Sequence, residues 1–151
     1  GWPLKLMATV LVISYVIAGL AKLRVTGWSW MDGEVLRIQM AYDNVRKIEL
    51  GALHAPLGGW LVQFGWLFPI LGTVSLLLEL GAPLALLGRR LAWLWAIGVW
   101  LFHFGVLLFM AIFFAYPMSG AGLTPFFRAE IGLERIRALR WVRRLGLGSA
   151  P

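Results

Sequence analysis

Residues 4–23 read LKLMATVLVISYVIAGLAKL, a run of twenty residues in which the charged side chains, Lys5 and Lys22, lie near the two ends. At 1.5 Å per residue, a helix of this length is about 30 Å long, which matches the hydrocarbon core of a bilayer. Lysines near the ends of such a helix can extend their amines toward the headgroups. This run therefore predicts a membrane-spanning helix and decides the fold class.

The composition of the whole chain agrees with a membrane protein. Of its 151 residues, 60% are hydrophobic and 14% are charged, and the mean hydropathy is +0.80. A soluble domain carries about a quarter charged residues, so this chain lacks the polar surface that a water-soluble globule requires. The absence of cysteine excludes thiolate metal sites. A net charge of +7 in such a chain is more typical of lipid-headgroup contact than of nucleic-acid binding, and we expect no nucleic-acid partner.

Two further apolar runs predict two more spans. Residues 70–88 and residues 91–115 are each long enough, at 1.5 Å per residue, to cross the bilayer core. Gly88, Arg89 and Arg90 at their junction predict a tight turn. The predicted architecture is thus an all-α integral membrane protein with about three transmembrane helices, over about 4–23, 70–88 and 91–115.

Shorter helices are predicted around these spans. They are an interfacial helix over 30–50, a short or re-entrant helix over 57–68, and a basic amphipathic C-terminal tail over 126–151. Residues 1–125 then form one membrane helical domain.

The segment over 30–50 has an apolar and a polar arc at helical spacing. The apolar arc comprises Val35, Ile38, Ala41, Tyr42, Val45, Ile48 and Ala52, and the polar arc comprises Arg37, Asp43, Asn44 and Lys47. An amphipathic helix lying at the membrane interface fits this pattern, and so does a solvated connecting helix.

The distribution of basic residues predicts the topology. Lys5, Arg89 and Arg90 lie on one side of the predicted spans, and the other eleven of the fourteen basic residues lie in the first span's end, the first loop and the tail. Because basic residues are enriched in cytoplasmic loops, we expect the first loop and the C-terminus to be cytoplasmic. The expected location is a bacterial inner membrane.

Three ionisable residues lie within the predicted spans, and such residues are costly in hydrocarbon. They are Lys22, Glu79 and His103. Pro83 follows Glu79 by four residues and has no N–H, so we expect a kink and a free carbonyl at Glu79. Glu79 and His103 lie at similar depth in two antiparallel predicted spans, so we expect them to form a hydrogen-bonded pair. We expect Lys22 to join this pair only through water, a ligand or a tilted helix.

Structural interpretations of the same residues remain open. Glu79 and His103 could simply satisfy each other between packed helices, and Lys22 could extend toward the headgroups. One glutamate and one histidine are too few ligands for a metal, so no metal site is expected. Ala18, Gly19 and Ala21 would let another helix approach the first span closely.

Three motifs in this chain resemble the HTTM family, which comprises the vitamin K-dependent gamma-carboxylases and their bacterial relatives. Residues 15–23 (YVIAGLAKL), followed by Trp30 and Gly33, resemble its Y-x-x-A-G-x-x-K-L…W-x-x-G element. Residues 77–80 (LLEL) with Pro83 resemble its acidic helix, and Phe102-His103 with the phenylalanines at 109–114 resembles its F-H…F helix. A DoxX-like four-helix family shares part of the first two motifs, whereas Trp30-x-x-Gly33 and Phe102-His103 favour HTTM.

The resemblance implies a role for Lys22 as the base that deprotonates vitamin K hydroquinone. It covers only the C-terminal half of that family's membrane domain, because the preceding spans and the lumenal domain of the carboxylases have no counterpart here. The predicted function is therefore an accessory subunit of a larger membrane complex, with membrane lipids and other membrane subunits as partners. The alternative is part of an HTTM-type enzyme acting on a quinone or lipid, with Lys22, Glu79 and His103 as catalytic residues.

Overall fold

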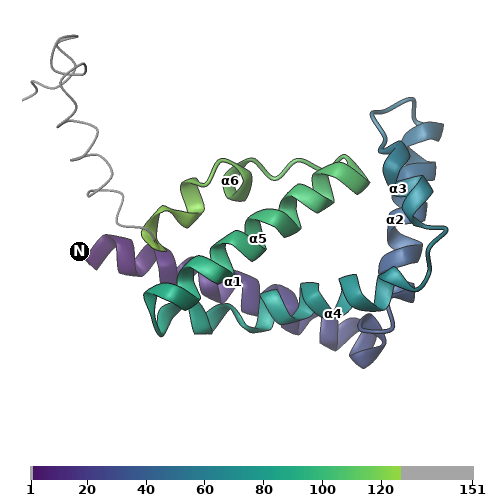
Figure 1. Cartoon of the computed structure of the whole chain (residues 1–151). Helices are drawn as coiled ribbons and strands as arrows, with labels where there is room; N and C mark the ends of the chain where they lie inside the picture. Colours follow the sequence, from purple (N-terminus) through teal and green to yellow (C-terminus); the bar gives the residue numbers. More distant parts are fainter. Residues whose placement is uncertain (1, 127–151) are drawn as a thin grey trace, which may run out of the picture.

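The computed structural model describes residues 2–126, and these are helical with no strand among them (Figure 1). The elements in chain order are α1 (Trp2–Thr26), η1 (Gly27–Trp30), α2 (Glu34–Glu49), α3 (Pro56–Leu61), α4 (Leu67–Leu80), η2 (Ala82–Leu86), α5 (Arg89–Met110), α6 (Ala115–Met118) and η3 (Ala121–Phe126), where η marks a 3-10 helix. The predicted all-α class is confirmed for this part of the chain. The predicted basic helix over 126–145 lies outside the described residues, apart from Phe126.

Two of the described helices, α1 and α5, are long and apolar enough to cross a membrane. They contain 25 and 22 residues. α4 is apolar as well, but its 14 residues are shorter than the bilayer core requires. The structure therefore has two helices of spanning length, where the sequence predicts three.

The predicted second span is interrupted. α4 begins at Leu67 and ends at Leu80, and η2 follows with Pro83 in its first turn. The break predicted from Pro83 is thus present, because a residue without an N–H cannot continue the helical hydrogen bonds. It divides the run over 70–88 into an α-helix and a 3-10 helix.

Three other helices also end earlier than predicted, whereas α1 runs to Thr26, beyond the predicted end at residue 23. α5 stops at Met110 rather than at residue 115, because Ala111 adopts a left-handed conformation with φ of 49°. α2 lies within the predicted 30–50, and α3 ends at Leu61, within the predicted 57–68.

The helices form an elongated bundle that is closed at one end (Figure 1). α1 packs along α4 and η2, and α5 packs against η2 and turns back along them. α2 and α3 lie across the end of the bundle where α5 finishes. Apolar side chains of α1, η2 and α5 form the core of the opposite part, among them Val12, Ala82 and Val99.

After α5 the chain returns along the bundle through α6 and η3 (Figure 1). Leu123 is buried in the core with Val12, and the ring of Phe126 lies 5.2 Å from that of Trp95. Phe126 thereby lines a hollow together with Lys5 and Arg89. The last described residues thus lie at the opposite end of the bundle from α2. The topology predicted from the sequence instead places the tail on the same side as the first loop.

α2 turns most of its apolar arc outward, whereas Asn44 and Lys47 of its polar arc point inward. Its exposed apolar side chains are Ile38, Tyr42, Val45 and Ile48. Lys47 Nζ donates to Met110 O at 2.5 Å, and Asn44 Nδ2 donates to Phe109 O at 3.2 Å. These donors satisfy the last carbonyls of α5, which have no partner within their own helix. An exposed apolar arc favours the interfacial interpretation of this helix over a solvated connecting helix.

Candidate functional site

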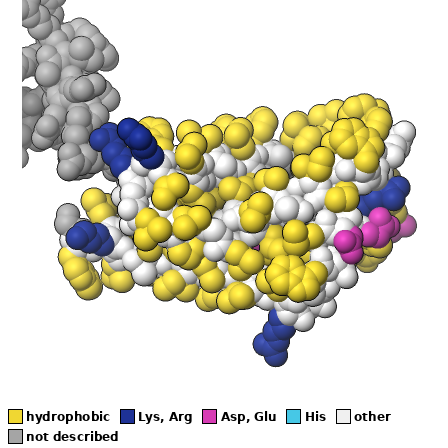
Figure 2. Space-filling model, turned by 60° about the horizontal axis from the view of Figure 1, so that its bottom comes forward, with side chains coloured by type: hydrophobic (Ala, Val, Ile, Leu, Met, Phe, Trp, Pro, Cys, Tyr) yellow, Lys and Arg dark blue, Asp and Glu magenta, His cyan; other side chains and the backbone are white. Residues whose placement is uncertain are grey.

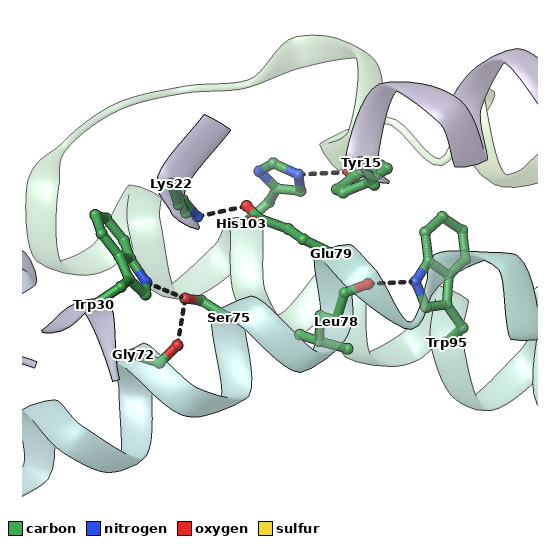
Figure 3. A network of polar contacts seen from close by, with 9 residues as sticks. All are labelled: Tyr15, Lys22, Trp30, Gly72, Ser75, Leu78, Glu79, Trp95 and His103. Atoms are coloured by element: carbon green, nitrogen blue, oxygen red, sulfur yellow. Dashed lines mark hydrogen bonds and ion pairs between the residues drawn. The ribbon is translucent and has the colours of Figure 1, made fainter. Parts of the chain in front are cut away.

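An ion pair joins α1 to α4 near the middle of the bundle (Figure 3). Lys22 Nζ donates to Glu79 Oε1 at 2.5 Å, and the two side chains are 21% and 7% exposed. The helices can approach because residue 19 is glycine: a Cβ there would lie 3.1 Å from Glu79 Cβ and 2.8 Å from Leu80 Cδ2. The close approach predicted from the small residues before Lys22 is therefore confirmed at Gly19.

A second pair joins α1 to α5. The hydroxyl of Tyr15 lies 2.7 Å from Nε2 of His103, and His103 is 8% exposed. The Tyr15 ring also packs edge-on against Trp95, with centroids 5.2 Å apart. The indole N–H of Trp95 in turn donates to Leu78 O at 2.9 Å, in the last turn of α4. Tyr15 is thus held by packing as well as by its hydrogen bond.

Trp30 closes the site on the side of η1. Its indole N–H donates to Ser75 Oγ at 2.9 Å, and Ser75 Oγ donates to Gly72 O at 2.8 Å (Figure 3). The ammonium of Lys22 lies 4.7 Å from the centre of the Trp30 ring and 5.7 Å from that of Phe102. Aromatic faces attract a cation at these distances, so the rings add to the attraction of Glu79.

These side chains line one cavity of about 530 Å³. Its walls come from α1, α2, α4, α5 and the segment that follows α5, and its polar lining includes Tyr15, Lys22, Ser75, Glu79 and His103. Pockets for small molecules typically measure about 300–1,000 Å³ and combine apolar walls with a few convergent polar groups. The cavity fits that description in both size and chemistry.

Two buried polar atoms at the cavity have no hydrogen-bond partner among the described residues. They are Glu79 Oε2 and His103 Nδ1. Buried polar atoms are nearly always hydrogen-bonded, since an unpaired one costs about 1–3 kcal/mol. An ionised carboxylate oxygen can only accept, whereas the imidazole nitrogen donates or accepts according to the tautomer. The site therefore offers hydrogen-bonding capacity beyond what its own side chains use.

All three predicted site residues line this cavity, but their predicted pairing is wrong. Glu79 pairs with Lys22 rather than with His103, and His103 pairs with Tyr15. The prediction counted depth from the start of each apolar run. In the structure, η1 turns the chain back so that Trp30 lies at Ser75, and the first turns of α4 pack against this turn. The C-terminal part of α1 therefore meets the C-terminal part of α4.

Tyr15 and Ser75 belong to the site although the sequence analysis did not select them. Tyr15 precedes Lys22 by seven residues and Ser75 precedes Glu79 by four, spacings that put each pair on one helix face. This helical spacing was the feature of the sequence from which Tyr15 and Ser75 could have been selected. Within residues 2–126, no group of three or more His, Asp or Glu side chains is arranged to hold a metal ion.

Comparison of the chain with protein-family models, with curated proteins and with solved structures finds no match. The resemblance to the HTTM family thus stays a prediction that rests on the motif residues.

Proposed function

We propose that this chain is an integral membrane protein that binds a membrane-soluble amphiphile, of quinone or lipid type, at the cavity formed by Lys22, Glu79, His103 and Tyr15. The observation that carries the proposal is the pair of buried atoms without partners, Glu79 Oε2 and His103 Nδ1, in the wall of a cavity of about 530 Å³. A ligand head that pairs with them would remove their desolvation cost.

The surface of the described chain supports the membrane setting. Figure 2 shows hydrophobic side chains over the length of one face, with charged side chains at its margins. Exposed large side chains occur along α1 and α5, including Ile17, which is 60% exposed, and Leu94, which is 69% exposed. Apolar patches of this extent mark contact with lipid or protein rather than with water. In this setting α4 and η2 together provide a third, broken crossing beside α1 and α5.

The site specifies the head of the ligand. Glu79 Oε2 requires a hydrogen-bond donor, and a hydroxyl group can donate to it while accepting a hydrogen bond from another group. The rest of the lining is mostly apolar, as in Leu11, Phe102 and Val106. A hydroxyl-bearing ring or glycerol head with an apolar remainder meets both conditions.

The HTTM resemblance adds a reaction class, in which Lys22 acts as the base on such a hydroxyl. In that role the Lys22 ammonium passes a proton to Glu79 across their hydrogen bond, and the free amine then takes the proton of the ligand. Glu79 becomes the neutral acid and the ligand becomes the anion beside the lysine cation. The hydrogen bond from Lys22 Nζ to Glu79 Oε1 supports this role, because it provides the route for that proton transfer.

An accessory role in a larger complex is the other function that the sequence predicts. The exposed apolar side chains of α1 and α5 suit protein neighbours as well as lipids. A subunit that only packs against others does not require a cavity lined by an ion pair and two unpaired buried atoms. The cavity therefore favours ligand binding.

Equilibrium binding to the full chain in lipid nanodiscs tests the proposal. The probes are a short-chain benzoquinone, the corresponding hydroquinone and a monoacylglycerol, with binding to empty nanodiscs subtracted. We expect saturable binding of the hydroquinone or the monoacylglycerol, weakened about tenfold or more by Glu79→Gln or Lys22→Met, because a charge-assisted contact is lost.

The matched control is Ile17→Ala, which changes a lipid-facing side chain on the same helix as Lys22. It should leave the affinity unchanged. Binding that never saturates, or that is equal in all variants, would contradict the proposed function.

A further inference from the structure

A second cavity of about 410 Å³ lies between α2, α4 and α5. Every residue that lines it is apolar or glycine, among them Leu71, Val74 and Leu101. It contains none of the polar groups that would orient a ligand head. A cavity of this kind suits hydrocarbon alone.

The two cavities share walls. Leu36, Phe102, Val106 and Met110 line both of them. Phe102 also lies beside Lys22, with its ring centre 5.7 Å from Nζ. The apolar cavity therefore adjoins the polar site instead of forming a separate pocket elsewhere in the bundle.

Two glycines of α5 lie in the wall of this second cavity. A Cβ at Gly98 would lie 2.7 Å from Leu78 Cδ2, so this glycine permits close packing against α4. A Cβ at Gly105 would meet no atom within 4 Å. Glycine in the middle of a helix is less favourable than alanine, so an open position of this kind is costly to the helix. At Gly105 the missing side chain leaves space in the cavity wall.

We infer that the apolar cavity binds the hydrocarbon chain of the same molecule whose polar head occupies the Lys22–Glu79 cavity. The inference rests on the proposed function and narrows it, because it requires an amphiphile with a single tail attached to its head. A compact molecule without a tail would fill only the first cavity. The apolar cavity would hold at most one of the two hydrocarbon chains of a two-chain lipid.

Photolabelling with tailed probes tests the inference. Two probes carry a diazirine at the middle of a ten-carbon chain, one with a hydroquinone head and one with a monoglyceride head, so that the two sources of such a tail are distinguished. Each is irradiated with the full chain in nanodiscs, and the labelled residues are identified by mass spectrometry. We expect label on residues of α4 and α5 that line the second cavity, and its loss when excess unlabelled probe is present.

Gly105→Leu adds a side chain at the wall of the second cavity, at a position where the new Cβ has no atom within 4 Å. It should reduce labelling of the cavity residues about tenfold, while the affinity for a tailless hydroquinone changes less than about twofold. Gly59→Leu on α3 is the matched control, since its Cβ also meets nothing within 4 Å and Gly59 lines neither cavity. This control should leave the labelling unchanged.

The outcomes separate the inference from the proposed function. Label spread over the lipid-facing side chains of α1 and unaffected by Gly105→Leu would overturn the inference, even if the tailless probe still bound in a Glu79-dependent manner. Failure of both tailed and tailless probes to bind saturably would instead overturn the proposed function.

Discussion

The middle of the bundle and its α2 end both contain buried polar side chains, but these have different partners. At the α2 end, the contacts of side chains with other elements are to backbone atoms: Arg37 to Val62 O, Asn44 to Phe109 O and Ala55 N, and Lys47 to Met110 O. Within α2, Lys47 also pairs with Asp43 one turn earlier. In the middle, side chains pair with one another across helices, as in Lys22 with Glu79 and Tyr15 with His103.

This difference indicates that the polar side chains at the α2 end stabilise the fold, whereas those in the middle of the bundle serve binding. Backbone carbonyls at a helix end need a donor whatever the protein does, so the α2 contacts are explained by stability. No backbone group requires the Lys22–Glu79 pair, and it leaves Glu79 Oε2 without a partner among the described residues. Substitutions in the middle should therefore alter binding, whereas those at the α2 end should alter stability alone.

The largest expected effect is that of Glu79→Ala, which leaves the Lys22 ammonium without its carboxylate. Removing one partner of a buried ion pair costs about 3–5 kcal/mol. We expect a loss near the lower end of that range, because Lys22 remains 21% exposed and lies against aromatic rings. Reversible unfolding in mixed micelles measures it. Glu79→Gln keeps an oxygen acceptor and should recover most of the stability, though not the binding.

Asn44→Ala should come next, with a loss of about 2 kcal/mol in the free energy of unfolding. It removes one side chain that serves two buried backbone groups, the N–H of Ala55 and the carbonyl of Phe109. Ligand affinity should stay within about twofold of the wild type, since Asn44 does not line either cavity. A marked loss of affinity in a folded Asn44→Ala protein would break the division between the two regions.

A comparison of two lysines sharpens the same division. Lys47→Met should cost about 1.5 kcal/mol, with no effect on binding, because it removes a hydrogen bond from a charged donor to Met110 O together with the partly exposed ion pair to Asp43. Lys22→Met should weaken binding about tenfold or more. Parallel unfolding and binding measurements on the two variants give the result, and equal effects on binding would contradict the assignment of the site.

Tyr15→Phe should have the smallest effect on stability, about 1 kcal/mol, because it removes one hydrogen bond and keeps the ring against Trp95. Its effect on binding should be larger than that of Asn44→Ala, since the freed His103 imidazole can then turn within the cavity. Unfolding and probe binding together check this. Binding unchanged by Tyr15→Phe would show that His103 is fixed without Tyr15.

Local sequence patterns predicted the helices and the break at Pro83. They also selected Lys22, Glu79 and His103, which line one cavity, although Lys22 was expected to lie apart from the other two. These predictions follow from hydropathy, from the missing N–H of proline and from the cost of charge in hydrocarbon. The pairing could not be predicted, because it depends on where α1 crosses α4. That crossing is set by Gly19 and by the turn at η1, which are tertiary features.

The α2 end shows the same limit. The two arcs of its helix were evident from their spacing, but the carbonyls that its polar side chains contact belong to residues 62, 109 and 110. No local pattern links those residues to α2. The early end of α5 at Met110, which exposes these carbonyls to α2, likewise depends on packing rather than on hydropathy.

The return of the chain through α6 and η3 brings the two ends of the described chain together. Trp2 and Phe126 lie at the same end of the bundle (Figure 1). The returning segment, residues 111–126, carries no charged side chain. The described residues place basic side chains at both ends of the bundle. Lys5 and Arg89 lie at the end where Phe126 is found, and Arg37, Arg46 and Lys47 lie on α2 at the other end.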